Sequence, residues 1–582
     1  MDKTSAGYLL TSLIERINRD QIGSVSGPEK EALAIALLHL TGRMPDAQGE
    51  NGPLSAGAAG AATNGTSSLV DSTVVAPAHK PVDHFAPPPL PHVELVLDAV
   101  LRDEPTNADV LLCLDFGTAM SKAFAAGYPN ENFDLALGAT AGRDGYTLPS
   151  SVFIGDDYKA YFGYEAIEKS EGLVESGRER LDSIKSWLSL RHEGDLDGLA
   201  CLLTPVFNPA PFKLTQGDLI RIYLAYLTDI ATTSLSSCEL NGIAIDRYVK
   251  RRFARPCWPN DVQAKWADRV MRELLAEAQI LADTFRGQWR GGIEVGVIKA
   301  AIEKVKLLDD RPDYLIDMGV PEPVAVAASA FSESENARDA FMVVDAGAGT
   351  TDFGLFISTR HPKDEVSRVF QVSTSIQGLM QAGDKIDSYL RGFIGRKESF
   401  DTSDTSGKLI EADLRRRIRG LKEQLFKTKK LEYSLIDGTV GVIDLADFLA
   451  DPMVEKFTQS VEAGFRKSLE MLDETWLKWL ANDQVKLHVV VTGGSSGLPM
   501  MKSLGKGVII VRGHSIMRSA VDPVPRWMED QPEEFVSLYP QLAVAIGGTA
   551  LELPETLTAP PVFGGGATRS AYVAGSLHVS GA

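Results

Sequence analysis

The sequence has few cysteines and no long apolar run. Its 582 residues include four cysteines, which are widely spaced and form no Cys-x-x-Cys pair. That spacing argues against a disulfide framework and is typical of reduced core thiols in a cytosolic protein. The nine histidines show no His-x-x-x-His or similar ligand spacing, so we do not expect a zinc enzyme.

The sequence also has fewer basic than acidic residues. The chain has 59 Lys and Arg against 78 Asp and Glu, a formal net charge of −19. Sequence-independent binding of nucleic acid rests on Lys and Arg neutralising phosphates, so we do not expect a nucleic-acid partner. A membrane span needs about 18 apolar residues in a row, and no such run occurs. The first ten residues, MDKTSAGYLL, lack the apolar core of a signal peptide, so we expect a cytoplasmic protein.

What is present is the composition of a large globular protein, with 44% apolar and 24% charged residues. Residues 1–45 contain an apolar helical face and a Ser-Gly-Pro-Glu helix start, which predict a small helical segment. Residues 46–106 are rich in Gly, Ala and Pro, which predicts a flexible linker. A main domain is expected from about Val110, and residues 556–582 are expected to form a flexible tail.

A glycine-rich turn between two apolar runs is the most informative stretch. Residues Phe341–Phe356 read FMVVDAGAGTTDFGLF, which predicts a buried β-hairpin. Glycines at its tip permit φ > 0 and let backbone N–H groups approach a ligand. Such N–H groups form an anion site, and the neighbouring Asp and Thr suit a Mg²⁺-bound phosphate. For this stretch alone, an ordinary tight hairpin is the alternative interpretation.

The same layout occurs earlier in the chain. The apolar run Leu111–Leu114 leads into Asp115–Lys122, DFGTAMSK, and a second apolar run follows. This repetition predicts an internally duplicated fold in which each half offers one phosphate-binding hairpin. A third stretch, Thr492–Pro499, TGGSSGLP, places paired glycines after the apolar run Leu487–Val491. An adenine or ribose fits against such glycines, and a simple strand-to-helix turn is the alternative.

In this order the stretches resemble the nucleotide-binding motifs of the superfamily of actin, sugar kinases and 70-kDa heat-shock chaperone ATPases. Asp115–Lys122 resembles the first phosphate motif, Asp345–Asp352 the second, and Val491–Pro499 the adenosine motif. Pro321–Ala328, PEPVAVAA, is similar to the Glu-Pro-x-Ala-Ala-Ala signature of DnaK-type chaperones. Gln541–Gly548 resembles the second connecting helix of the superfamily.

The resemblance implies an α/β fold, a duplicated two-lobed actin-like ATPase with ribonuclease H-like halves and a nucleotide cleft between the lobes. Lobe I would cover residues 107–330 with a return helix at 541–555, and lobe II would cover residues 331–540. Small residues in the two connecting helices would let these helices cross closely at a hinge. A DnaK-type foldase carries a peptide-binding domain after the ATPase, and we do not expect one here.

The resemblance also implies roles that follow phosphoryl-transfer chemistry. Asp115 and Asp345 would hold Mg²⁺ through water. Lys185 would lie by the γ-phosphate and the attacking water, although a solvated helix lysine is the alternative. Glu322 would order the metal's waters or the nucleophile. The residues expected to bind ATP or ADP are Gly117, Thr118, Lys122, Gly347, Gly349, Thr350, Thr351, Gly383, Lys422, Gly493, Gly494 and Ser495.

Two positions depart from the chaperone pattern. Lys122 has the spacing of actin's phosphate-contacting lysine. Arg419 stands where chaperones have a glutamate, three residues before Lys422, so adenosine recognition by that helix is not implied. Arg419 also ends a basic run, Leu414–Arg419, for which we expect a solvated helix face, with an acidic partner or nucleic acid as the alternative.

The expected function is that of a DnaK-like switch that binds and hydrolyses ATP, changes lobe closure with nucleotide state, and signals to a protein partner. The partner would bind the N-terminal helices or the insertions at Ala282–Asp317 and Gly513–Leu538. The expected cofactors are ATP or ADP and Mg²⁺. The alternatives are an actin-like ATP-dependent filament protein, a small-molecule kinase of the same superfamily, and a degenerate nucleotide-binding scaffold.

Overall fold

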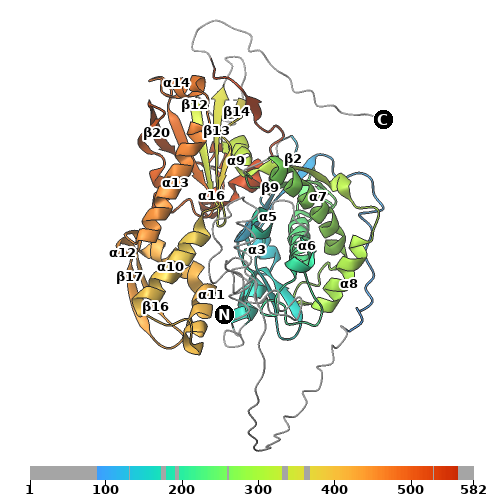
Figure 1. The fold of residues 1–582 in the computed structure, drawn as a ribbon. Coiled ribbons are helices and arrows are strands. Elements are labelled where there is room, and N and C mark those ends of the chain that lie inside the picture. The colour runs from blue at the N-terminus through green and yellow to red at the C-terminus, as the bar shows by residue number, and fades with distance from the viewer. Residues whose placement is uncertain are drawn as a thin grey trace, which may run out of the picture. The chain divides into compact units, whose positions relative to one another are not determined.

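A computed structural model describes residues 88–129, 131–171, 178–190, 196–258, 261–330, 339–359, 368–528 and 530–561. These residues form a mixed α/β structure with two large sheets, which confirms the predicted α/β class (Figure 1). The helices predicted within residues 1–45, the linker up to residue 87 and the tail beyond residue 561 lie outside the described residues. We call the described residues 88–330 the first half and 339–528 the second half.

The first sheet belongs to the first half. Its strands are β1 (Val110–Asp115), β2 (Met120–Gly127), β3 (Glu131–Phe133), β4 (Leu148–Pro149), β9 (Lys250–Arg255) and β11 (Ile316–Pro321). Their order is β11-β9-β1-β2-β3, with β4 also pairing with β2. β11, β9 and β1 run parallel, whereas β1–β2 and β2–β3 are antiparallel. The predicted hairpin at Asp115 is therefore confirmed as β1–β2.

The second sheet belongs mainly to the second half. Its strands are β12 (Asp339–Ala346), β13 (Thr351–Thr359), β14 (Arg368–Val372), β15 (Gln377–Leu379), β18 (Leu487–Thr492), β19 (Lys506–Val511), β20 (His514–Val521) and β21 (Glu555–Leu557). The order is β19-β20-β18-β12-β13-β14-β21, and β15 also pairs with β13. Within it, β20-β18-β12-β13-β14 repeats the strand order and directions of the first sheet. The predicted hairpin at Asp345 is confirmed as β12–β13.

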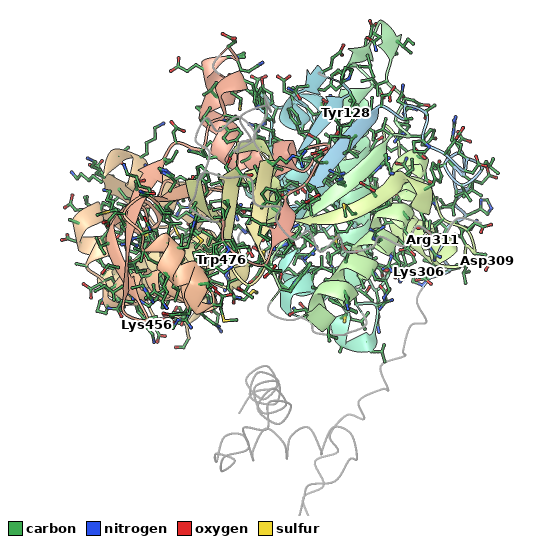
Figure 2. All side chains as sticks on the ribbon, turned by 90° about the horizontal axis from the view of Figure 1, so that it is seen from above. Tyr128, Lys306, Asp309, Arg311, Lys456 and Trp476 are labelled. Carbon is green, nitrogen blue, oxygen red and sulfur yellow. The ribbon has the colours of Figure 1, made fainter. Side chains whose placement is uncertain are left out.

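Helices surround the first sheet and complete the first hydrophobic core. They are α3 (Leu137–Thr140), α4 (Gly163–Glu171), α5 (Ser186–Leu190), α6 (Gln216–Leu235), α7 (Asp261–Thr284) and α8 (Val295–Lys306). Figure 1 shows α6, α7 and α8 packed beside one another. Two small sheets accompany them, one of β5 (Val152–Ile154), β6 (Lys159–Phe162) and β10 (Ile293–Glu294), the other of β7 (Glu239–Leu240) and β8 (Ile243–Ala244). Lys306 and Arg311, labelled in Figure 2, form ion pairs with Asp218 and Glu277 in this half.

The second half has its own core. Its helices are α10 (Gly383–Glu398), α11 (Thr405–Thr428), α12 (Leu445–Leu449), α13 (Pro452–Glu470), α14 (Glu474–Leu480) and α15 (Pro499–Ser503), and a hairpin of β16 (Lys430–Ser434) and β17 (Val440–Asp444) joins α11 to α12. Local sequence explains several helix starts, because Asp404, Asp451 and Asp473 each cap a helix with the side chain. Trp476 of α14, labelled in Figure 2, is buried in this core.

Two helices connect the two sheets. α9 (Glu322–Ala330) follows β11, and α16 (Glu533–Gly547) returns from the second half to contact α9, β1 and β2. A Cβ atom on Gly547 would lie 1.7 Å from the carbonyl oxygen of Ala325, so these helices cross at backbone contact. The prediction of a close crossing between small residues is confirmed. Apolar side chains of both helices form a third cluster with strand residues of both sheets.

Some predicted boundaries are wrong. Part of the segment 46–106 is not a free linker, because Val93 and Ala99 are buried and their carbonyl oxygens accept bonds from Lys304 and Tyr314. The tail predicted at 556–582 starts inside β21, whose three residues pair with β14. The return helix predicted at 541–555 is α16, which begins and ends earlier.

The two segments expected as partner-binding insertions are largely regular structure. Ala282–Asp317 contains the end of α7, then β10 and α8, and α8 buries Ile298 and Ile302 in the first core. Gly513–Leu538 contains β20 and the start of α16. Among the described helices, none is long and apolar enough to cross a membrane.

Candidate functional site

The tips of the two glycine hairpins meet. The turn between β1 and β2 comes from the first half, and the turn between β12 and β13 comes from the second half. A Cβ atom on Gly349 would lie only 2.9 Å from the hydroxyl oxygen of Thr118, so the tips are in contact. A Cβ atom on Gly117 would lie 2.0 Å from the carbonyl oxygen of Met120, which explains why the first tip requires glycine.

A cavity of about 150 Å³ lies at this meeting point. The predicted site residues that line it are Asp115, Gly117, Thr118, Lys122, Lys185, Glu322, Asp345, Gly347, Gly349, Thr350, Lys422, Gly493, Gly494 and Ser495. Residues from six separate stretches of the sequence are thus brought together.

Two predicted residues do not line the cavity. Thr351 is buried, and its hydroxyl donates to the carbonyl oxygen of Gln381 at 2.7 Å. Gly383 lies behind the wall as the first residue of α10, and its N–H donates to the carbonyl oxygen of Gly347 at 3.2 Å. Both positions therefore support the second hairpin and do not face the cavity.

Two of the three lysines that line the cavity are paired with carboxylates next to the hairpin tips. Lys185 lies just before α5, and its Nζ donates to Oε1 of Glu322 at 2.7 Å. Glu322 is the first residue of α9. Both side chains are buried, so the interpretation of Lys185 as a solvated helix lysine is wrong. Lys122 on β2 forms an ion pair with Asp115 at the end of β1, with 3.0 Å between Nζ and Oδ2.

Burial and crowding of carboxylates dominate the electrostatics. Burial, followed by the charges of Glu322 and Asp115, raises the pKa of Asp345 from 3.8 to about 7. The hydroxyl of Thr492 donates to Oδ1 of Asp345 at 3.0 Å and opposes this shift. Burial alone would lower the pKa of Lys185, but the nearby Glu322 and Asp115 charges outweigh it and raise that pKa.

Asp352 is a buried carboxylate that sequence reasoning did not place in the site. Its Oδ1 accepts a hydrogen bond from the N–H of Cys257 at 2.8 Å. Burial, reinforced by the charge of Glu322, raises its pKa well above the usual range. The sequence did carry a signal for it, because Asp352 ends the motif that begins at Asp345.

The third glycine stretch is bound to the second hairpin. Gly493 has φ +86°, and a Cβ atom there would lie 2.3 Å from the carbonyl oxygen of Ala346. Ser495 donates its N–H to Ala346 and its hydroxyl to the carbonyl oxygen of Gly347, at 2.8 and 2.7 Å. Lys422 of α11 faces the same cavity and forms an ion pair with Asp387 at 2.9 Å. Sequence reasoning did not predict seven further lining residues, which are Ala119, Met120, Ala348, Arg419, Glu423, Gln541 and Val544.

The donor set fits a hydrated divalent cation. Asp115 and Asp345 both line the cavity, and the charge of Asp115 contributes to the raised pKa of Asp345, a repulsion that a divalent cation would offset. Mg²⁺ keeps several of its waters and binds proteins through one or two carboxylates, a form that Asp115 and Asp345 suit. Within the described ranges, no three His, Cys, Asp or Glu side chains are arranged to hold a metal ion directly.

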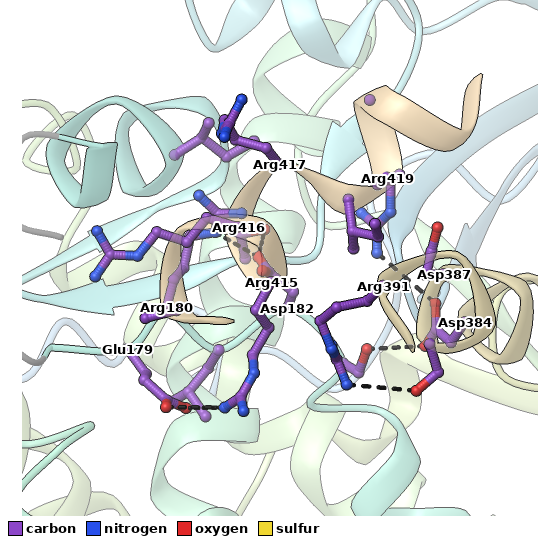
Figure 3. Close-up of a pocket in the computed structure, with 18 of the residues that line it drawn as sticks. Glu179, Arg180, Asp182, Asp384, Asp387, Arg391, Arg415, Arg416, Arg417 and Arg419 are labelled. Carbon is purple, nitrogen blue, oxygen red and sulfur yellow. Dashed lines mark hydrogen bonds and ion pairs between the residues drawn. The ribbon is translucent and has the colours of Figure 1, made fainter. Parts of the chain in front are cut away.

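A larger cavity of about 810 Å³ adjoins the first one, and Arg419 and Glu423 line both. Its walls include the basic run of α11, which was expected to be a solvated helix face (Figure 3). That expectation is wrong in part. Arg415 pairs with Glu179 of the first half at 2.8 Å, and Arg416 donates to the carbonyl oxygen of Ser170 at 2.6 Å.

No protein-family model matches the chain, and a search of curated proteins returns no match.

Proposed function

We propose that the chain is a molecular switch that binds and hydrolyses ATP and belongs to the superfamily of actin, sugar kinases and heat-shock chaperone ATPases. In this proposal the two halves are the two lobes of an actin-like fold of the DnaK-like type. The repeated strand order of the two sheets supports the fold. The observation that carries the function is the meeting of two glycine hairpins around buried carboxylates and two lysines.

In this proposal the residues of the cavity have different roles in phosphoryl transfer. Backbone N–H groups and hydroxyls of the hairpins, those of Thr118 and Thr350 among them, bind phosphate oxygens. Asp115 and Asp345 would hold Mg²⁺ through its waters, and the metal would supply positive charge that neutralises the phosphates. Lys185 is kept protonated by Glu322 and holds the terminal phosphate and the attacking water in place. Glu322 keeps a second carboxylate oxygen for orienting that water.

The small size of the cavity implies that the two halves change their conformation when a nucleotide binds. Sites for small organic ligands measure about 300–1,000 Å³, and this cavity measures about 150 Å³. A nucleotide therefore needs the two halves to move apart before it binds. Closure around ATP and opening after hydrolysis would give two states that a protein partner distinguishes.

A single-turnover measurement of ATP loss tests hydrolysis. The folded wild-type chain should hydrolyse ATP in the presence of Mg²⁺. Lys185→Met should abolish hydrolysis and keep ATP binding, because it removes the group that positions the water. Lys456→Met is the matched control, because Lys456 lies exposed on α13 (Figure 2). ATP that survives intact with the wild-type chain would favour the non-hydrolysing scaffold.

One observation favours the filament alternative. Lys122 lines the cavity beside Asp115, where actin-like spacing predicts a second lysine on the phosphates. Sedimentation of the chain with and without ATP tests it. A pellet that depends on ATP would support a filament, and a monomer that stays in solution at high concentration would contradict one.

A further inference from the structure

The second sheet carries an exposed apolar patch at β19 and β20, the two strands at one of its edges (Figure 1). Val508 lies opposite Met517 in the register. Ile510 and Val521 lie at even spacings from these residues, so the four side chains point to one face. The exposed fractions are 50% for Val508, 61% for Ile510, 55% for Met517 and 38% for Val521. With the usual areas of these side chains the patch amounts to roughly 400 Å², and the largest patch of a typical monomer, about 300–600 Å², is often functional.

The patch continues a face that helices cover further inside the sheet. Val490 of β18 is the register partner of Val521, and it is fully buried in the third cluster with apolar side chains of α9 and α16. Val521 lies one strand further out and is partly exposed. The helix cover therefore ends between β18 and β20, and α16, which contacts β18, stands beside the patch as a wall beside a floor.

The hairpin turn identifies which backbone groups face the free edge of β19. Val511 and His514 close a two-residue turn between β19 and β20, and both turn residues have positive φ, as a type I′ turn requires. The pair that closes such a turn is hydrogen-bonded, and hydrogen-bonded pairs alternate with open pairs from there. The backbone groups of Lys506, Val508 and Ile510 therefore point away from β20, towards the free edge.

Two arginine side chains already occupy this edge. The carbonyl oxygen of Lys506 accepts a hydrogen bond from Nη2 of Arg518 at 2.6 Å, and the carbonyl oxygen of Ile510 accepts one from Nη1 of Arg466. A further strand added at the edge would find two of the three carbonyl oxygens taken. Native proteins use charged side chains to protect edge strands against such pairing. The apolar face, and not the backbone edge, is thus the surface left to bind a partner.

We propose that this face joins two copies of the chain in a symmetric dimer, in which the two patches pack on each other about a two-fold axis that runs along the strands. Rotation about that axis places α16 of each copy beyond the β19 edge of the other copy, where the sheet has ended. A helix and the gap between two facing sheets both measure about 10 Å, so the step formed by the patch and α16 is self-complementary. The proposal does not depend on ATP binding.

Charge and area favour a second copy over another kind of partner. Both strands are described in full, and Lys506 is the one charged residue among those whose side chains share the face of the patch. Two copies therefore meet without like charges at the centre of the interface. A standard interface buries about 800 Å² per partner, somewhat more than half of it apolar. The patch supplies most of that apolar area, and the contact of β19 with α16 of the second copy adds to it.

Sedimentation equilibrium of the full chain without nucleotide tests the proposal. At tens of micromolar, the wild type should have the mass of two chains, each of 62.9 kDa. Ile510→Lys and Met517→Lys each place a charge inside the interface, so each should weaken self-association about tenfold or more. Both residues are more than half exposed in the single chain, so both variants should keep the circular dichroism spectrum of the wild type.

Val440→Lys is the matched control, because Val440 lies on β17, is 75% exposed, and receives the same charge outside the patch. This variant should form the dimer like the wild type. If Ile510→Lys fails to fold, Met517→Lys decides the result. The proposal is overturned if the folded wild type sediments as a single chain at these concentrations, if both patch variants remain dimers, or if Val440→Lys weakens self-association as much as they do.

Discussion

Lys185 and Glu322 are 137 residues apart in the chain, yet Nζ of Lys185 donates to Oε1 of Glu322 at 2.7 Å. The pair joins the segment before α5 to the first residue of α9, next to the tips of both glycine hairpins. Each side chain is about a tenth exposed or less. The pair is therefore a buried ion pair in which each charge depends on the other.

Removing one partner of this pair should cost more than removing both. Lys185→Met leaves the Glu322 carboxylate buried without its cation, which should lower the free energy of unfolding by about 3–5 kcal/mol. The double variant Lys185→Met with Glu322→Gln should recover a large part of that loss, because no unpaired charge remains. Urea unfolding of the wild type, both single variants and the double variant measures the coupling. Losses that simply add would contradict a direct ion pair.

The raised pKa of Asp345 predicts how stability depends on pH. Its pKa is 3.8 in ordinary surroundings and about 7 in the folded chain, so between these values the folded state holds a proton that the unfolded state releases. The stabilisation is complete below pH 3.8 and is lost as the pH rises through 7. Without nucleotide, the wild type should therefore lose free energy of unfolding across this range, by a few kcal/mol at most.

Asp345→Asn is the control for that titration. Asn is neutral and has nearly the same shape as a protonated Asp, so the variant should fold normally and show a smaller loss of stability with rising pH. Urea unfolding at a series of pH values, without Mg²⁺, gives the two slopes. Equal slopes for wild type and variant would show that Asp345 does not carry the titration.

Two Gly→Ala changes should have opposite effects on the stability of the folded chain. One lies at the crossing of α9 and α16, and the other lies on the exposed side of α11. Gly547→Ala places a Cβ atom 1.7 Å from the carbonyl oxygen of Ala325, so the helices must separate, at a cost of about 1–3 kcal/mol. Gly420→Ala on α11 meets nothing within 4 Å and should gain about 0.5–1 kcal/mol from helix propensity. Thermal unfolding compares the two. A Gly547→Ala protein as stable as the wild type would mean that the helices do not cross at backbone contact.

The parts of the structure that could be predicted from the sequence are those that depend on local patterns. Both hairpins lie where apolar runs flank a glycine turn, since strand and turn preferences act over a few residues. The burial of Lys185 could not be foreseen, because its partner Glu322 is far away in the sequence. The same holds for Arg415, whose partner Glu179 is 236 residues distant. The basic run looked solvated because its sequence does not show that residues of the first half lie opposite it.

The predicted boundaries of the linker and the tail agreed least with the structure. Such boundaries also depend on residues that are distant in the sequence. The Gly- and Pro-rich composition that marks a linker ends before Val93, but the prediction extended to residue 106. Whether the intervening residues dock depends on hydrogen-bond donors for their backbone carbonyl oxygens and on space in a core. Lys304 and Tyr314 supply donors to this segment from much later in the chain.

The most direct test of the account is an isothermal titration of the full chain with ATP, in the presence and in the absence of Mg²⁺. We predict one ATP per wild-type chain with a clear Mg²⁺ requirement. Asp345→Asn should lose most of the Mg²⁺-dependent affinity while folding normally, whereas Asp483→Asn, a change at an exposed position, should bind like the wild type. A well-folded wild-type chain that shows no ATP binding with Mg²⁺, or an Asp345→Asn variant that binds equally well, would contradict the account.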